Sequence, residues 1–298
     1  MRFSYLLIFC VLPLSMNATA FAEAIETEGS GESSWKFSQE TELAYWYTAE
    51  AHLGRANLAE QSISAQYVLT SQYKETPPLR TGFDWQRFSF SSAGFTAVPN
   101  TLQSEAIIAG VDFEVFGSVF VRVEAQPGFY SASSEILGSS FNVPLIIGGS
   151  YLYSKDLQLV LGVSIDATRK YPVLPGGGVR WQINHNWLLN AVLPKPRLEL
   201  KISKRLTAYL GGDVEEAAYR TDENFGRAQG RSELSSSWID FTEVRAGGGA
   251  VWDIAAEVKL ELEAGALFYR QLDYHKAGVD LHSSDTAPYG HIGFSAKF

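Results

Sequence analysis

The sequence has 298 residues, of which 46% are hydrophobic, 13% aromatic and 19% charged, and its formal net charge at pH 7 is −9. An acidic chain is repelled by phosphate backbones, so nucleic acid is excluded as an expected partner. The single cysteine is Cys10, which lies in a segment that we expect to be removed on export. The exported chain therefore has no thiol for disulfides, thiolate metal sites or a cysteine nucleophile.

Residues 1–22 have the pattern of a secretory signal peptide. Arg2 provides the positive charge, the apolar run FSYLLIFCVLPL follows, and Ala20-Phe21-Ala22 provides the small residues of a cleavage site. This run falls short of the ~20 residues that a spanning helix needs, and no later stretch is longer. Residues 23–34, EAIETEGSGESS, are small and acidic, which predicts a disordered lead. If the exported chain enters a membrane, it does so with strands.

From residue 35 onward, apolar residues recur at every second position. In the segment 157–167, LQLVLGVSIDA, every odd-numbered residue is apolar, which places these side chains on one face of a strand but all around a helix. We predict fourteen strands: 35–47, 61–73, 82–90, 105–115, 117–127, 141–153, 157–167, 178–183, 187–193, 197–203, 206–220, 238–251, 257–270 and 288–298. Twelve strands is the alternative, because 178–183 and 187–193 are shorter than the about 9–11 residues of a crossing strand.

The connections between these strands alternate in length. The short set is 74–81, 116–117, 154–156, 184–186, 203–205 and 253–256. The other set is long and rich in Ser, Gly, Asn and Pro, with 194–196 as its short exception: 48–60, 91–104, 128–140, 168–177, 221–237 and 271–287. Short turns on one rim and long loops on the other are typical of outer-membrane barrels. The sequence therefore predicts an all-β chain, with a single antiparallel transmembrane β-barrel over residues 35–298.

The two faces of the predicted strands differ in polarity. Arg or Lys facing lipid at the bilayer midplane costs about 2–4 kcal/mol, so the apolar face is expected outside and the charged face inside. The predicted lumen-lining residues are Asp112, Glu114, Arg122, Glu124, Asp166, Glu199, Lys201, Lys259, Glu261 and Glu263. Acids outnumber bases in this set, so an open pore would favour cations. The alternative is a self-neutralising network that fills a narrow barrel.

The chain ends on HIGFSAKF, in which Ile292, Phe294 and Phe298 occupy alternate positions together with Ala296. This ending resembles the C-terminal signature of outer-membrane β-barrels. The resemblance implies that Ile292, Phe294 and Phe298 form a signal read by the outer-membrane barrel assembly machinery. We also expect the last strand to pair with the first, because a bilayer leaves no backbone N–H unpaired.

A second resemblance covers roughly the last 125 residues. The segment 174–212, LPGGGVRWQINHNWLLNAVLPKPRLELKISKRLTAYLGG, and the segment from Val244, VRAGGGAVWDIAAEVKLELEAGALFYRQL, are similar to an uncharacterised bacterial family of porin-like outer-membrane barrels. The resemblance implies a barrel in the bacterial outer membrane. It assigns no catalytic residue.

Three other patterns in the sequence are candidate sites. The glycine triplets at 176–178 and 247–249 lack the Lys-Ser/Thr of a phosphate-binding loop, so we expect bends or close packing. The loop 271–287 contains His275, His282 and Ser283, which leaves a barrel hydrolase as a lesser alternative, although a loop holds a catalytic triad poorly. The two histidines match no standard metal spacing. We therefore predict no catalytic residue, metal or cofactor.

The expected function is a passive pore or channel for small solutes or ions. Its expected partners are outer-membrane lipid and the assembly machinery. A non-conducting structural or adhesive barrel, which binds partners through its long loops, is the alternative.

Overall fold

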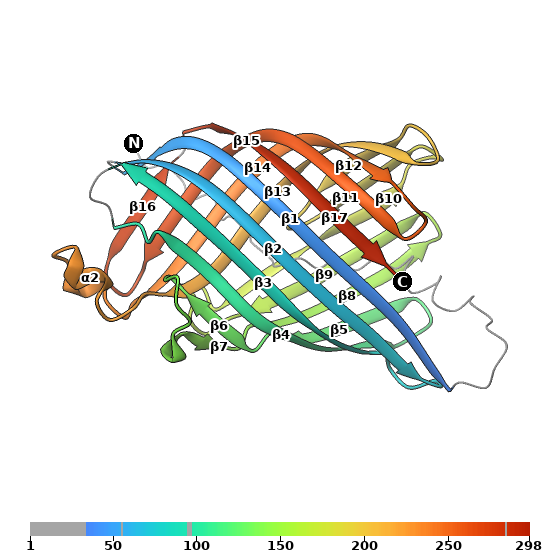
Figure 1. The fold of residues 1–298 in the computed structure, drawn as a ribbon. Coiled ribbons are helices and arrows are strands. Elements are labelled where there is room, and N and C mark those ends of the chain that lie inside the picture. Colours follow the sequence, from blue (N-terminus) through green and yellow to red (C-terminus); the bar gives the residue numbers. More distant parts are fainter. Residues whose placement is uncertain (1–33, 55, 94–96, 284) are drawn as a thin grey trace, which may run out of the picture.

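The computed structural model describes residues 34–54, 56–93, 97–283 and 285–298. The predicted signal peptide and the lead up to residue 33 lie outside these ranges. Strands account for 70% of the structure and helices for 4%, and fourteen strands form a closed antiparallel β-barrel (Figure 1). The predicted fold class is confirmed, with fourteen strands rather than twelve. Within the described ranges, no helix has the length and apolar character needed to cross a membrane.

Each wall strand pairs with its two neighbours in the ring. In ring order the wall strands are β1 (Trp35–Leu53), β2 (Ala56–Tyr73), β3 (Leu79–Ala93), β4 (Thr101–Glu114), β5 (Val119–Ala125), β8 (Leu145–Ser154), β9 (Leu157–Ile165), β10 (Val173–Gln182), β11 (Trp187–Val192), β12 (Arg197–Lys201), β13 (Leu206–Arg220), β14 (Trp238–Asp253), β15 (Val258–Tyr274) and β17 (Ala287–Lys297). Loops carry the short elements β6 (Gly128–Ser131), η1 (Gly138–Ser140), β7 (Phe141–Asn142), α2 (Phe225–Ala228), η2 (Ser232–Leu234) and β16 (Val279–Ser283).

The barrel closes where β17 lies between β15 and β1. Phe294 is opposite Leu43, and Ile292 is opposite Tyr45. The ladder runs to the last residue, because the Gln39 N–H donates to the Phe298 carbonyl (2.8 Å) and the Phe298 N–H donates to the Gln39 carbonyl (2.9 Å). The expected pairing of last strand with first is confirmed.

The two rims of the barrel differ. One rim carries the start of β1, the end of β17 and the short turns, and is named here the turn rim. The opposite rim carries α2, β6, β7 and β16, and is named the loop rim (Figure 1). One predicted long loop, 48–60, is wrong: β1 and β2 continue as a paired hairpin with Ala51 opposite Leu58 after an irregularity that follows Thr48. The backbone keeps its ladder there, since inward Leu58 has a core to pack against.

The outer face of the wall is apolar. Leu161 is 74% exposed, Leu210 68% and Ile107 60%, while their sequence neighbours Val160 and Ile108 are buried. This alternation follows from the strand period of two, which sends successive side chains to opposite faces of the wall. The side chains that carry charge in the middle of the strands therefore lie inside.

Candidate functional site: the barrel interior

The part of the interior next to the loop rim is filled by apolar side chains from opposite walls. Phe88 of β3 lies 4.9 Å from Phe241 of β14 between ring centroids, and 6.5 Å from Tyr219 of β13. All three side chains are fully buried. We name this cluster the wall core, whose buried members are Leu53, Leu58, Phe88, Phe90, Val98, Leu102, Ala106, Tyr130, Ala132, Ala217, Ala218, Tyr219, Leu234, Trp238, Ile239, Phe241, Leu272, Tyr274 and Val279.

The wall core joins strands that are far apart around the ring. β4 and β13 lie on opposite sides of the barrel, because the same number of wall strands separates them in either direction around the ring. Their backbones nevertheless approach one another, and both strands contribute side chains to the wall core. The barrel is therefore flattened at this level, like two packed sheets. The contact excludes water from this part of the lumen.

Two loops tie the loop rim together across the opening. The Ala132 N–H, just after β6, donates to the Arg220 carbonyl of β13 at 2.8 Å. The loop 166–172 reaches β14 and β15, where the Lys170 N–H donates to Asp240 (2.8 Å) and the Lys170 Nζ donates to Asp273 (2.6 Å). The hydrogen bond to Asp273 raises the pKa of Lys170 above its ordinary value, against the opposing effect of burial. These hydrogen bonds join opposite sides of the loop rim, in addition to the apolar contacts of the wall core.

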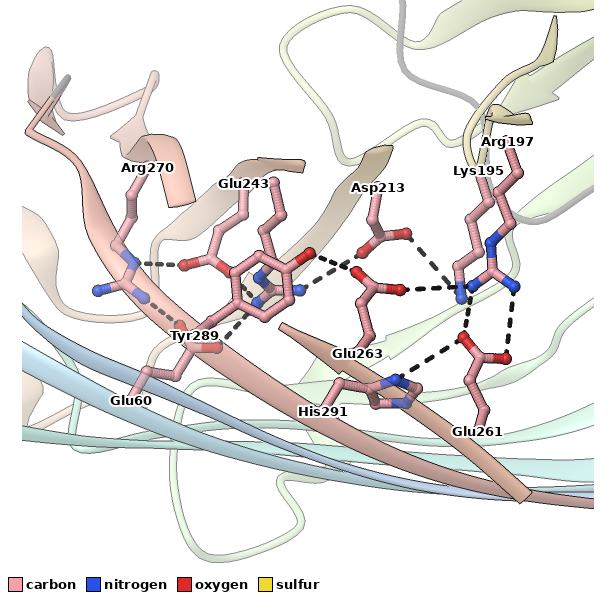
Figure 2. Close-up of polar contacts among 11 residues, drawn as sticks. Glu60, Lys195, Arg197, Asp213, Glu243, Glu261, Glu263, Arg270, Tyr289 and His291 are labelled. Carbon is pink, nitrogen blue, oxygen red and sulfur yellow. Dashed lines mark hydrogen bonds and ion pairs between the residues drawn. The ribbon is translucent and has the colours of Figure 1, made fainter. Parts of the chain in front are cut away.

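Figure 2 shows a closed ring of four charges in the barrel interior. It adjoins the wall core, because Arg270 donates to the Leu58 carbonyl at 3.4 Å and lies 5.8 Å from the Phe90 ring centroid. Arg245 donates to Glu60 at 2.9 Å and also to Glu243, and Arg270 donates to Glu60 at 2.6 Å and also to Glu243. The four side chains are at most 2% exposed. The ring itself has two acids and two bases, and each guanidinium contacts both carboxylates. Arg245 also contacts Asp213, outside the ring, at 3.4 Å. We name this group the arginine ring.

A second polar cluster lies nearer the turn rim and is named the Glu261–Glu263 cluster. Arg197 of β12 donates to Glu261 at 2.6 Å and lies 3.7 Å from Glu263. Two phenols also contact this carboxylate pair: the single Tyr209 O–H is shared between Glu261 (2.6 Å) and Glu263, and Tyr289 donates to Glu263. The remaining member is His291 of β17, stacked on Trp46 at 3.9 Å between ring centroids.

The structure brings some of the ten predicted lumen residues together. Arg122 forms a two-bond ion pair with Asp112 (2.7 and 2.9 Å), and Glu261 lies beside Glu263. Glu124 pairs with Arg80 at 3.4 Å. Asp166 instead organises the loop 166–172, accepting from the Thr168 N–H at 2.9 Å. Glu114, Lys201 and Lys259 are exposed.

The interior is hollowed at the turn rim. A pocket of ≈ 560 Å³ lies there, lined by the turns 155–156 and 183–186 and by the inward side chains of Gln182, Leu188, Glu199, Lys201 and Thr207. Acidic and basic groups both contribute to its lining. The interior therefore has a polar, hollow end and an apolar, packed end.

The loop considered for hydrolysis does not assemble a triad from its described residues. His282 lies 3.7 Å from Asp280, whereas His275 lies 3.6 Å from Asp240 of β14, so the two histidines face different carboxylates. The Ser283 hydroxyl accepts from the Asp285 N–H at 3.1 Å. Ser284 lies outside the described residues. Burial lowers the pKa of His275, which favours its neutral form.

Several interior residues were not predicted from the sequence, namely Glu60, Arg245, Arg270 and the wall core. A usable signal for the core is a change of phase within one strand. In β3 the apolar aromatic residues are odd-numbered at Phe83 and Trp85, then even-numbered at Phe88 and Phe90. Such a switch places apolar side chains on both faces of a strand and indicates an interior contact.

Fold and interior together define a closed antiparallel β-barrel with an apolar outer face and a charged interior. No family model matches the chain, and no curated protein matches it. Among solved structures, it is similar to an outer membrane channel from Pseudomonas putida F1 (TM-score 0.46, 9% identity, covering 87% of this chain and 95% of the other).

Two further solved structures have comparable similarity. One is the TodX deltaS2S3 mutant monoaromatic hydrocarbon channel (TM-score 0.43, 8% identity, 90% and 91% covered). The other is the translocator domain of the autotransporter NalP from Neisseria meningitidis (TM-score 0.39, 12% identity, 94% and 93% covered). Likeness at this level carries no argument about activity, and the barrel is established by the chain's own strand pairing.

Proposed function

We propose that this chain is an outer-membrane β-barrel that acts as a channel for small solutes or ions and is closed in the present conformation. The observation that carries the proposal is the division of the interior. A charged, hollow part adjoins the turn rim, and the wall core closes the part next to the loop rim. Opening requires the contact between the β3–β4 and β13–β14 walls to loosen.

The apolar outer face supports a lipid environment, because exposed side chains such as Leu161 and Leu210 would otherwise meet water. Bacterial outer-membrane barrels carry short turns at the periplasm and long loops outside the cell. By this rule the turn rim faces the periplasm and the loop rim the exterior.

The excess of acids among the predicted lumen residues supports cation preference in the open state. Glu199 and Lys201 line the hollow end, where an entering ion meets them first. Neutralising the acidic lining residue Glu199 is expected to reduce the preference of the open channel for cations.

Single cysteines test the closure, because the predicted exported chain has none. Lys201→Cys places a thiol at the hollow end, and Ser104→Cys places an isosteric thiol on the inner face of β4 near the wall core. A membrane-impermeant maleimide is expected to label Lys201→Cys rapidly and Ser104→Cys slowly in folded barrels. Equal labelling rates would show that the interior is open along its length.

Planar-bilayer conductance tests the channel itself. We expect brief, cation-selective openings separated by long closed periods. A continuous current through the wild-type barrel would overturn the closed state. The absence of openings across voltage and salt conditions would overturn the channel.

The second candidate is a non-conducting barrel that presents its loops to partners. The size and burial of the wall core favour it, because each large apolar side chain contributes roughly 1.5–3 kcal/mol when buried. A non-conducting barrel predicts fast maleimide labelling of Lys201→Cys and no current in planar bilayers.

A further inference from the structure

The inward face of β15 and β17 holds two carboxylates and an imidazole side by side. Glu261 and Glu263 are two residues apart on β15 and so share one face, and the register places His291 of β17 directly opposite Glu263. One potential ligand atom from each of the three side chains lies within 4.8 Å of the others. The arrangement is fixed by two neighbouring strands rather than by a loop.

The orientation of the His291 ring is fixed by its neighbours, and one of its two ring nitrogens makes no hydrogen bond. Its side chain is 7% exposed and stacks on Trp46 with an interplanar angle of 22°. A Cβ at Gly293 would lie 3.0 Å from the His291 Cε1 and 3.2 Å from its Nε2, so the glycine gives the ring its space. The His291 Nδ1 has no hydrogen-bond partner and lies 3.8 Å from the Glu261 Oε1, too far for a hydrogen bond. A buried nitrogen that faces two carboxylates and makes no hydrogen bond is available to bind a cation.

We propose that Glu261, Glu263 and His291 form a binding site for one divalent transition-metal cation. Carboxylate oxygens together with an imidazole nitrogen suit borderline ions such as Zn²⁺, whereas Ca²⁺ and Mg²⁺ take oxygen ligands alone. The phenols of Tyr209 and Tyr289 contact the carboxylates and orient them, as partners of metal ligands commonly do. This site goes beyond conduction, and its test does not depend on whether the barrel opens.

Arg197 acts at this site as a tethered competitor. Its guanidinium contacts both oxygens of Glu261, at 2.6 and 3.3 Å, and stacks 4.1 Å from the Tyr209 ring centroid. Two carboxylates and one guanidinium leave a formal charge of −1, and a divalent cation would bring more charge to the same oxygens than Arg197 does. Metal binding therefore requires Arg197 to move aside, toward the lumen in which it is 22% exposed.

The test uses tag-free full-length barrel in detergent, titrated with zinc chloride in a calorimeter. Wild type is expected to bind one Zn²⁺ saturably, and His291→Ala to weaken binding roughly tenfold or more. Arg197→Gln is expected to tighten binding, because it removes the competitor. His282→Ala is the matched control, since that side chain is 62% exposed on β16, and it is expected to bind as wild type does.

Folding of every variant is checked by heat-modifiable migration, so that loss of binding is separated from loss of the barrel. Absence of saturable binding to wild type would overturn the site. Binding that survives in folded His291→Ala, or that is lost in His282→Ala, would overturn it as well. Binding that appears only in Arg197→Gln would show that the native cluster is an ion-pair network without a metal.

Discussion

Glu243 accepts hydrogen bonds from Arg245 and Arg270 in a part of the barrel from which water is excluded. In such surroundings a charge is tolerated because its partners remain in place, and removal of one partner leaves the other exposed to the low dielectric. The arginine ring is balanced, with Glu60 as the second acid. Its members therefore depend on one another.

Glu243→Gln is expected to lower the free energy of unfolding by about 3–5 kcal/mol, because Arg245 and Arg270 both lose a carboxylate that they share in a buried site. Urea unfolding of the lipid-reconstituted barrel measures the change. Glu233→Gln provides the control with the same chemistry, since Glu233 is exposed on η2 beside Arg231 and its loss should leave stability unchanged. Equal unfolding midpoints for the two variants would contradict the role assigned to the ring.

The short β10–β11 hairpin depends on close approach of its two backbones. A Cβ built at Gly178 would lie 1.9 Å from the Ala191 carbonyl oxygen, and a backbone atom cannot move aside as a flexible side chain can. By contrast, a Cβ at Gly290 of β17 would meet nothing within 4 Å. The strand pairing therefore has no space for a larger residue at Gly178, whereas it has space at Gly290.

Gly178→Ala is expected to destabilise the barrel by about 1–3 kcal/mol or more, because the added methyl overpacks the ladder. Gly290→Ala is expected to remain within about 0.5 kcal/mol of wild type. The measurement is the urea midpoint of heat-modifiable migration for both variants. A larger loss in Gly290→Ala than in Gly178→Ala would refute the steric explanation.

The strands could be predicted from the sequence because alternation is a local property. All fourteen predicted segments overlap wall strands, including β11 and β12, which have only 6 and 5 residues. The partners of the interior could not be predicted in the same way. Glu60 and Arg245 are 185 residues apart, and their contact depends on tilt and register around the whole ring. The wall core could not be predicted for the same reason, because its side chains come from strands on opposite walls of the barrel.

At the scale of the whole molecule, Phe298 contributes to closure of the barrel, and we predict a second, separable role for its side chain. The Phe298 backbone extends the ladder to Gln39 in both directions, whereas its side chain is 68% exposed on the outside. Closure of the barrel therefore uses the backbone. The predicted assembly signal uses the side chain.

Phe298→Ala is expected to fold in detergent as wild type does, because the backbone bonds are kept. In cells we expect a several-fold lower amount in the outer membrane, since the predicted assembly signal has lost its aromatic end. Quantitative blotting of membrane fractions beside in vitro folding yields provides the comparison. Equal losses in both assays would indicate that the side chain acts through stability alone.

The flattened wall also has a consequence for biogenesis. Phe88 and Phe90 lie on the third wall strand. The aromatic side chain against which both pack, Phe241, lies on the twelfth wall strand, which is synthesised much later. During transit and insertion, the first strands must hold these aromatic side chains without their final cover, on the face that later becomes the interior. Periplasmic chaperones are expected to shield this segment, so that the nascent barrel is most prone to aggregate before its late strands have docked.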